Sequence, residues 1–277
     1  MNNLSNYINI IGDYIGIPIL LPLTVFFIKS LLYVKEIRKH TDADIEEFVS
    51  LYNARIKDNL RICAEEILQF IGKGEKESIE HHLYICKKFN KTIGFVKFMY
   101  SCRYKYLFLA YIAIDKNDHL ANKYGLKLMI KKIYKEFVKK KKANLLITEI
   151  ERGTDGTHVT ALSKLISRYA KMYKAKSYFL DFDYMQPNMP NDNFDAVPEE
   201  ILSLVYIPIY HLANNRISKT ELISLLQSIY FEIYYPSCNE ITLCDCNNYN
   251  TYLESLIKIY AEILPEYIFL SPIDKQT

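Results

Sequence analysis

Two glutamates, Glu149 and Glu151, stand one residue apart at the end of the apolar segment NLLITEI. This segment is predicted to be a strand, and residues i and i+2 of a strand share one face. Paired carboxylates at a strand end can raise the pKa of one of them, which suits a general base, and they can bind a cationic amine. The alternative is an ion pair at the rim with Arg152 or Lys164.

Two further acidic residues could belong to the same site. Asp181 and Asp183 share a face of the predicted strand YFLDFDYM and could line a pocket for an amine. His119 and His158 fall in predicted loops, where a histidine is more often only solvated. Glu149 and Glu151 are therefore the candidate bases, and the two aspartates are the candidate substrate ligands.

The cysteines do not follow a metal-binding pattern. Cys238, Cys244 and Cys246 are spaced as C-x5-C-x-C without a second ligand pair, whereas structural zinc sites use two paired clusters. The adjacent His81 and His82 would point to opposite faces of a strand. We expect reduced cysteines and no metal.

The composition indicates a globular protein with a substantial core. Of the 277 residues, 50% are hydrophobic, which excludes a largely disordered chain. The 35 basic residues are nearly balanced by 32 acidic ones, for a net charge of +3. This small excess gives no indication of nucleic-acid binding.

Hydrophobic periodicity predicts an α/β (α+β) fold, a single mixed sheet with helices on its faces. Strands are expected over residues 31–39, 81–89, 92–100, 106–114, 144–150, 178–185 and 201–207. Helices are expected over residues 45–56, 64–71, 126–138, 158–173, 219–234 and 250–264.

The pattern divides the chain into an apolar extension (1–30), the mixed-sheet domain (31–207) and a helical extension packed on it (208–277). The uncharged run 14–28 is shorter than a bilayer span and contains Pro18 and Pro22. It is either an arm packed on the domain or on a partner subunit, or, with residues 14–34, a membrane anchor. The terminal helices carry apolar stripes that could wrap the core, cover the acceptor side or form a homodimer.

Over residues 31–207 the chain resembles the GNAT superfamily of acyl-CoA-dependent N-acetyltransferases. The segment EIRKHTDADIEEFVSLYN is similar to the family's first strand and helix, and YIAIDKNDHLANKYGLKLMI is similar to its acyl-CoA motif. The family's fifth strand resembles LITEIERG. The helix and strand that follow it resemble SRYAKMYKAKSYFLDFDYMQPNM. The DFDYMQP ending resembles a bacterial, uncharacterised subset with a Tyr-x-Gln-Pro turn.

The resemblance implies roles for particular residues. Backbone groups of Ile112, Ala113 and Ile114 would bind the pantetheine arm and polarise the thioester carbonyl. Tyr169 would protonate the departing thiolate. The loop that would hold the pyrophosphate comprises Asn122, Lys123, Tyr124, Gly125 and Leu126.

This loop departs from the family's Q/R-x-x-G-x-G/A pattern. Leu120 replaces Gln or Arg and Lys123 replaces the first Gly, whereas Gly125 is kept. The lysine either adds charge for the phosphates or marks an impaired site. Backbone N–H groups at the start of the following helix favour retained CoA binding, because they need no particular side chain.

The expected function is that of a cytoplasmic N-acetyltransferase that uses acetyl-CoA as cosubstrate and needs no metal. The amine of the acceptor would attack the thioester directly. The acceptor would be a small-molecule or protein amine, and the acidic residues favour a cationic one. The alternative is a catalytically impaired binding module of the same fold, tethered to a membrane or free of it.

Overall fold

The computed structural model describes ten stretches of the chain. They are residues 32–39, 41–56, 64–71, 78–115, 117–118, 124–152, 161–188, 201–209, 214–236 and 246–273. The N-terminal extension 1–30, the loop residues Asn122 and Lys123, and both loop histidines, His119 and His158, lie outside the described residues. The expectations for them stay predictions.

The described strands form one mixed sheet in the order β1-β2-β3-β4-β5-β8-β6-β10-β9, with β7 paired to β8. The β4–β5 pair is parallel and the other pairs are antiparallel. The strands are β1 (Leu32–Ile37), β2 (Ile79–Lys88), β3 (Lys91–Ser101), β4 (Tyr106–Ile114), β5 (Leu145–Glu151), β6 (Tyr178–Leu180), β7 (Tyr184–Met185), β8 (Ile201–Pro208), β9 (Arg216–Ser218) and β10 (Tyr267–Pro272).

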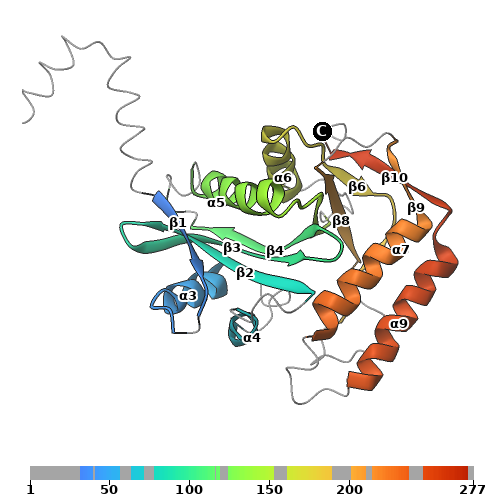
Figure 1. Cartoon of the computed structure of the whole chain (residues 1–277), viewed down its shortest axis with the longest axis horizontal. Coiled ribbons are helices and arrows are strands. Elements are labelled where there is room, and N and C mark those ends of the chain that lie inside the picture. The colour runs from blue at the N-terminus through green and yellow to red at the C-terminus, as the bar shows by residue number, and fades with distance from the viewer. Residues whose placement is uncertain are drawn as a thin grey trace, which may run out of the picture.

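Helices cover both faces of this sheet (Figure 1). One face carries α5 (Leu126–Ile133), continued by the π-helical η3 (Tyr134–Lys140), and α6 (Ala161–Met172). The other face carries α3 (Ile45–Arg55) and α4 (Ala64–Gln69) at one end, and α7 (Lys219–Ser228), η4 (Ile229–Tyr234) and α9 (Cys246–Ile263) at the other. The predicted mixed-sheet fold is confirmed.

The helix after β4 packs through the apolar stripe that its sequence predicts. Met129, Ile133 and Phe137 recur at helical spacing, and all three are buried in one cluster with Leu107 and Leu109 of β4. This packing fixes the start of α5 above the far end of β4, where the resemblance places the cofactor.

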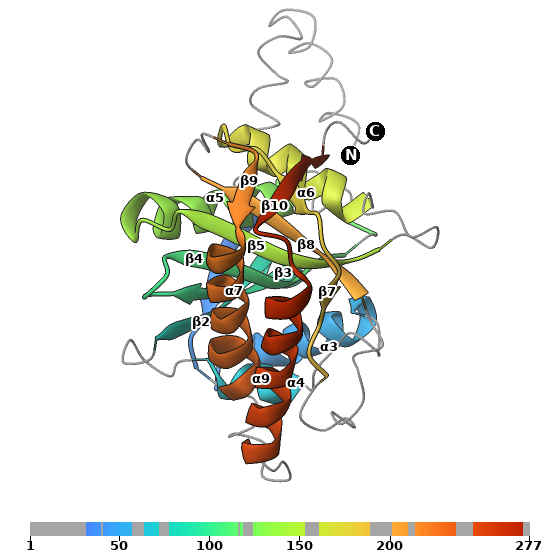
Figure 2. The ribbon, with the colours of Figure 1, turned by 90° about the vertical axis from the view of Figure 1, so that its right-hand side faces the viewer.

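The segment after Pro208 contributes more than helices, which corrects the prediction. β9 and β10 extend the sheet, and β10 pairs with β6. The sequence did not reveal them because β9 has only three residues and β10 only six, and both depend on pairing with strands distant in the chain. In Figure 2, α7 and α9 lie side by side, and their stripes, represented by Leu226 and Leu253, join the same cluster as Leu204 of β8.

Candidate active site

The central strands separate part of the way along the sheet. Parallel pairing of β4 with β5 ends at Leu109 and Thr148, although β4 continues to Ile114 and β5 to Glu151. Burial follows the same boundary, because β4 is fully buried up to Leu109 and only half-buried beyond it. The strand ends therefore form the two sides of a split that opens the sheet.

A bulge and a side-chain hydrogen bond mark the start of the split. Tyr111 of β4 lies opposite Lys97, and Leu109 lies opposite Phe98, so Ala110 is an extra residue in β4. Such a bulge bends and twists its strand. The Thr148 hydroxyl donates to the Leu109 carbonyl oxygen at 2.9 Å and so links the last paired residues of β4 and β5.

Glu149 is the first β5 residue after Thr148, the last one paired with β4. It faces the side of the sheet that carries η4. Its carboxylate accepts hydrogen bonds from the hydroxyls of Tyr184 and Tyr234, the latter at 2.7 Å. The residue keeps some exposed surface, while its carboxyl group is enclosed. A carboxyl group at this place is held in one orientation and still borders the split.

Burial raises the pKa of Glu149 to about 7, and the two tyrosine hydrogen bonds lower it against that effect. The sequence predicted that a neighbouring carboxylate would raise this pKa. In the structure burial raises it, and Glu151 makes no contribution. A pKa near neutrality gives a carboxylate enough proton affinity to act as a general base at physiological pH.

None of the other predicted acidic residues is among the groups that shift the pKa of this carboxylate. Asp183 is exposed and pairs with Arg152 at 2.6 Å, and Asp181 is exposed in the bend after β6. Arg152 thus takes Asp183 as its partner, rather than the rim glutamate that the alternative reading supposed. Glu151 lies on the same face as Glu149 by strand alternation, at the end of β5.

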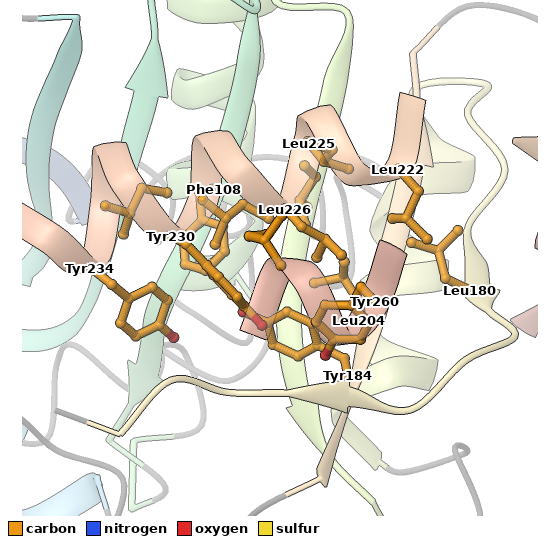
Figure 3. Close-up of a cluster of buried hydrophobic side chains, with 14 of the residues drawn as sticks. Phe108, Leu180, Tyr184, Leu204, Leu222, Leu225, Leu226, Tyr230, Tyr234 and Tyr260 are labelled. Carbon is orange, nitrogen blue, oxygen red and sulfur yellow. The ribbon is translucent and has the colours of Figure 1, made fainter. Parts of the chain in front are cut away.

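The Tyr-x-Gln-Pro segment connects Glu149 to the C-terminal helices. Tyr184 is its first residue, and the Gln186 side chain donates to the Tyr234 hydroxyl at 3.1 Å. Tyr230 donates to the Met185 carbonyl oxygen at 2.6 Å. Figure 3 shows Tyr230 and Tyr234 projecting from one helix toward the strand that holds Tyr184. Two residues of the motif therefore belong to the hydrogen-bond network around the candidate base.

Sequence reasoning missed Tyr184 and Tyr234 as partners of Glu149. The signal for Tyr184 was present in the motif, which we interpreted as a turn. Tyr234 carried no local signal, since it lies 85 residues from Glu149 among the 24 tyrosines of the chain.

The opposite face of the sheet holds the residues that the resemblance assigns to the cofactor. Ile112, Leu126 and Tyr169 line one side of a cavity between α5 and α6. Tyr124 and Gly125 are helical and directly precede Leu126, the first residue of α5. Burial raises the pKa of Tyr169, so its hydroxyl keeps its proton at neutral pH and is available as a donor.

Replacing Tyr169 by Phe is expected to lower turnover by about tenfold, because the departing thiolate loses a proton donor but is itself a weak base. Affinity for acetyl-CoA should stay nearly constant. Thiol release under saturating cosubstrate, compared with a calorimetric Kd, measures both. Unchanged turnover would remove Tyr169 from the reaction, and Tyr173→Phe on the same helix end is the matched control.

Two buried lysines on neighbouring strands differ in their partners. Lys87 of β2 pairs with Asp44 and Glu47, and these charges raise its pKa against the effect of burial. Lys97 of β3 is 4% exposed, and burial lowers its pKa to about 7. Its ammonium nitrogen lies 3.0 Å from Nδ1 of His81, and no described carboxylate forms an ion pair with it.

Neither a metal cluster nor a membrane-spanning helix occurs in the described stretches. No group of three or more His, Cys, Asp or Glu side chains is arranged to hold a metal ion there. None of the helices placed by the structure has the length and apolar character that crossing a bilayer requires.

The search of solved structures found acetyltransferases. A protein assigned to the GNAT family from Bacteroides thetaiotaomicron is 14% identical and matches 72% of this chain and 98% of its own, with a TM-score of 0.47. Diaminobutyrate acetyltransferase EctA from Paenibacillus lautus, solved with L-2,4-diaminobutyric acid and coenzyme A, is 16% identical. That match covers 66% of this chain and 99% of EctA, with a TM-score of 0.43.

The ribosomal-protein-S18-alanine N-acetyltransferase from Escherichia coli is 12% identical over 66% of this chain and 98% of its own, with a TM-score of 0.39. All three are described as acetyltransferases. No protein-family model and no curated protein matches the chain.

Proposed function

We propose that the protein is an N-acetyltransferase that transfers the acetyl group of acetyl-CoA to an amine. The separation of β4 from β5 beside Glu149 is the observation that carries this proposal. Three features support it: the open strand ends, the buried carboxylate of raised pKa, and a helix that begins beside Ile112.

The cosubstrate would enter from the face of α5 and α6. Backbone groups of Ile112, Ala113 and Ile114 lie on the β4 side of the split, where they would pair with the amides of the pantetheine arm. The pyrophosphate would lie at the start of α5, near Tyr124, Gly125 and Leu126, because the dipole of a helix favours an anion at its N-terminal end.

The acceptor would lie on the other face, beside Glu149. Glu149 would take a proton from the ammonium group, and the neutral amine would then attack the thioester carbonyl carbon. Collapse of the tetrahedral intermediate breaks the C–S bond, and Tyr169 would give its proton to the leaving thiolate. Holding the two reactants across the split would make the attack effectively intramolecular.

The acceptor would be a cationic amine on a small molecule or a protein. Glu149, and Glu151 on the same strand face, supply negative charge for its recognition, and Asp181 and Asp183 stay candidates farther out. The buried Glu149 carboxyl, held by two tyrosine hydrogen bonds, favours an enzyme over an impaired binding module. Tethering through residues 14–34, dimerisation and a cytoplasmic location stay open proposals.

Titration of acetyl-CoA into the full-length protein, followed by a thiol-release assay with a panel of amines, tests this function. Micromolar binding and amine-dependent thiol release would support it. Ligand at 100 times its Kd should also stabilise the fold by about 2.7 kcal/mol. A folded protein that binds no acetyl-CoA at millimolar concentration would contradict the proposal.

Replacing Gly125 by Glu is expected to weaken acetyl-CoA binding by at least tenfold, because it sets a negative charge beside the pyrophosphate. Gly125→Gln has nearly the same size and no charge, so comparing the two variants isolates the electrostatic effect. Equal affinity of both variants, measured by calorimetry, would mean that the pyrophosphate lies elsewhere.

A further inference from the structure

The cavity between α5 and α6 extends beyond the split. Leu109, Ile112 and Tyr169 line it beside the split, whereas Leu107 and Leu146 line it beneath the paired parts of β4 and β5. From Ile112 back to Leu107 the β4 backbone runs on the order of 15 Å, from a strand rise of ~3.3 Å per residue. The cavity thus continues well past the place of the thioester.

The far end of this cavity is lined by aromatic and aliphatic groups. The rings of Tyr134 and Tyr173 stack there at 4.0 Å between centroids, and Ala175 and Ile209 complete the lining. All the side chains that line the cavity are aliphatic or aromatic, and none carries a charge.

The volume is about 80 Å³, several times the roughly 10–15 Å³ that one water molecule needs. An acetyl group at the split would leave most of it unoccupied. The pantetheine arm fits it poorly, because its amides would lose their hydrogen bonds among carbon atoms. A hydrocarbon chain loses nothing in this way and gains from burial.

From this geometry we infer that the cavity takes the hydrocarbon chain of a longer acyl donor, so that the preferred cosubstrate is a medium-chain acyl-CoA. The inference rests on the proposed function and refines its acyl group. The thioester lies at the split, the chain runs from it between α5 and α6, and Ala175 and Ile209 limit its length.

Calorimetric titration of the full-length protein with CoA, acetyl-CoA, hexanoyl-CoA and octanoyl-CoA tests the inference. Each buried methylene is worth about fourfold in affinity, so hexanoyl-CoA should bind at least tenfold more tightly than acetyl-CoA. Acyl chains that bring no gain over acetyl-CoA would overturn the inference while leaving the proposed function intact. Failure of every CoA species to bind would contradict the proposed function itself.

Two variants locate the chain. Ala175→Leu fills the far end and should abolish the advantage of octanoyl-CoA over acetyl-CoA without weakening acetyl-CoA. Ala64→Leu, a similarly buried alanine on the opposite face of the sheet, is the control for overpacking. If Ala175→Leu does not fold, Ile209→Ala, which lengthens the cavity, should shift the preference toward longer chains. A chain-length preference unmoved by the folded variants would place the acyl chain elsewhere.

Discussion

Glu149→Gln should lower turnover by about 10²–10⁴-fold at pH 8, the usual contribution of a positioned general base. Gln keeps the shape and can still hydrogen-bond to Tyr184 and Tyr234, but it cannot accept the ammonium proton. Affinity for acetyl-CoA should change little, because the residues proposed to bind it lie on the opposite face of the sheet. Steady-state thiol release and calorimetry measure the two effects separately.

The pH profile distinguishes a base from a merely structural carboxylate. Because the pKa of Glu149 is about 7, kcat/KM should rise with pH until about one unit above that value and then level off. This limb should disappear in Glu149→Gln. In Tyr234→Phe it should move to higher pH, because the lost hydrogen bond is one that lowers the pKa. A profile that is the same in all three proteins would rule out Glu149 as the base.

Lys97→Met should stabilise the protein, and the gain should depend on pH. The pKa of Lys97 is about 7 in the fold and about 10.4 in the unfolded chain. Between these values the unfolded state binds the additional proton, so the stability of the unsubstituted protein rises with pH. The advantage of Lys97→Met should therefore be largest at pH 6 and shrink by about 2–3 kcal/mol by pH 9.

Lys87→Met is the matched control on the neighbouring strand, and it should act in the opposite direction. It removes a charge that Asp44 and Glu47 neutralise, so we expect a loss of about 1–3 kcal/mol. Urea denaturation of both variants between pH 6 and pH 9 gives the free energies of unfolding. A Lys97→Met curve parallel to that of the unsubstituted protein would show that Lys97 stays charged in the fold.

The central sheet could be predicted from sequence because each element carries its own periodicity. The strand at Tyr106–Ile114 was predicted with its observed bounds, since an apolar run between turn residues indicates a buried strand. β9 and β10 have no such signal, because their stability comes from pairing with strands distant in sequence. These two strands form only in the context of the folded sheet, so local sequence does not predict them.

The candidate site could be predicted only in part. Spacing identified Glu149 as a strand-end carboxylate, but the shift in its pKa comes from burial under η4, which spacing does not encode. Lys97 was not among the residues singled out from the sequence. Its burial depends on elements that pack on the sheet, since its nitrogen lies beside His81 and the His81 ring stacks on Phe70, which follows α4.

The connection between Glu149 and the C-terminal helices has a consequence for how the enzyme would respond to its surroundings. Tyr234 donates a hydrogen bond directly to the Glu149 carboxylate. Tyr230 and Tyr260 donate to backbone carbonyl oxygens of Met185 and Asp183, on either side of Tyr184. Loosening of η4 or α9 would readmit water and return the carboxyl toward the acidity of an ordinary glutamate. If Glu149 is the base, as we propose, the terminal quarter of the chain would govern the working pH range.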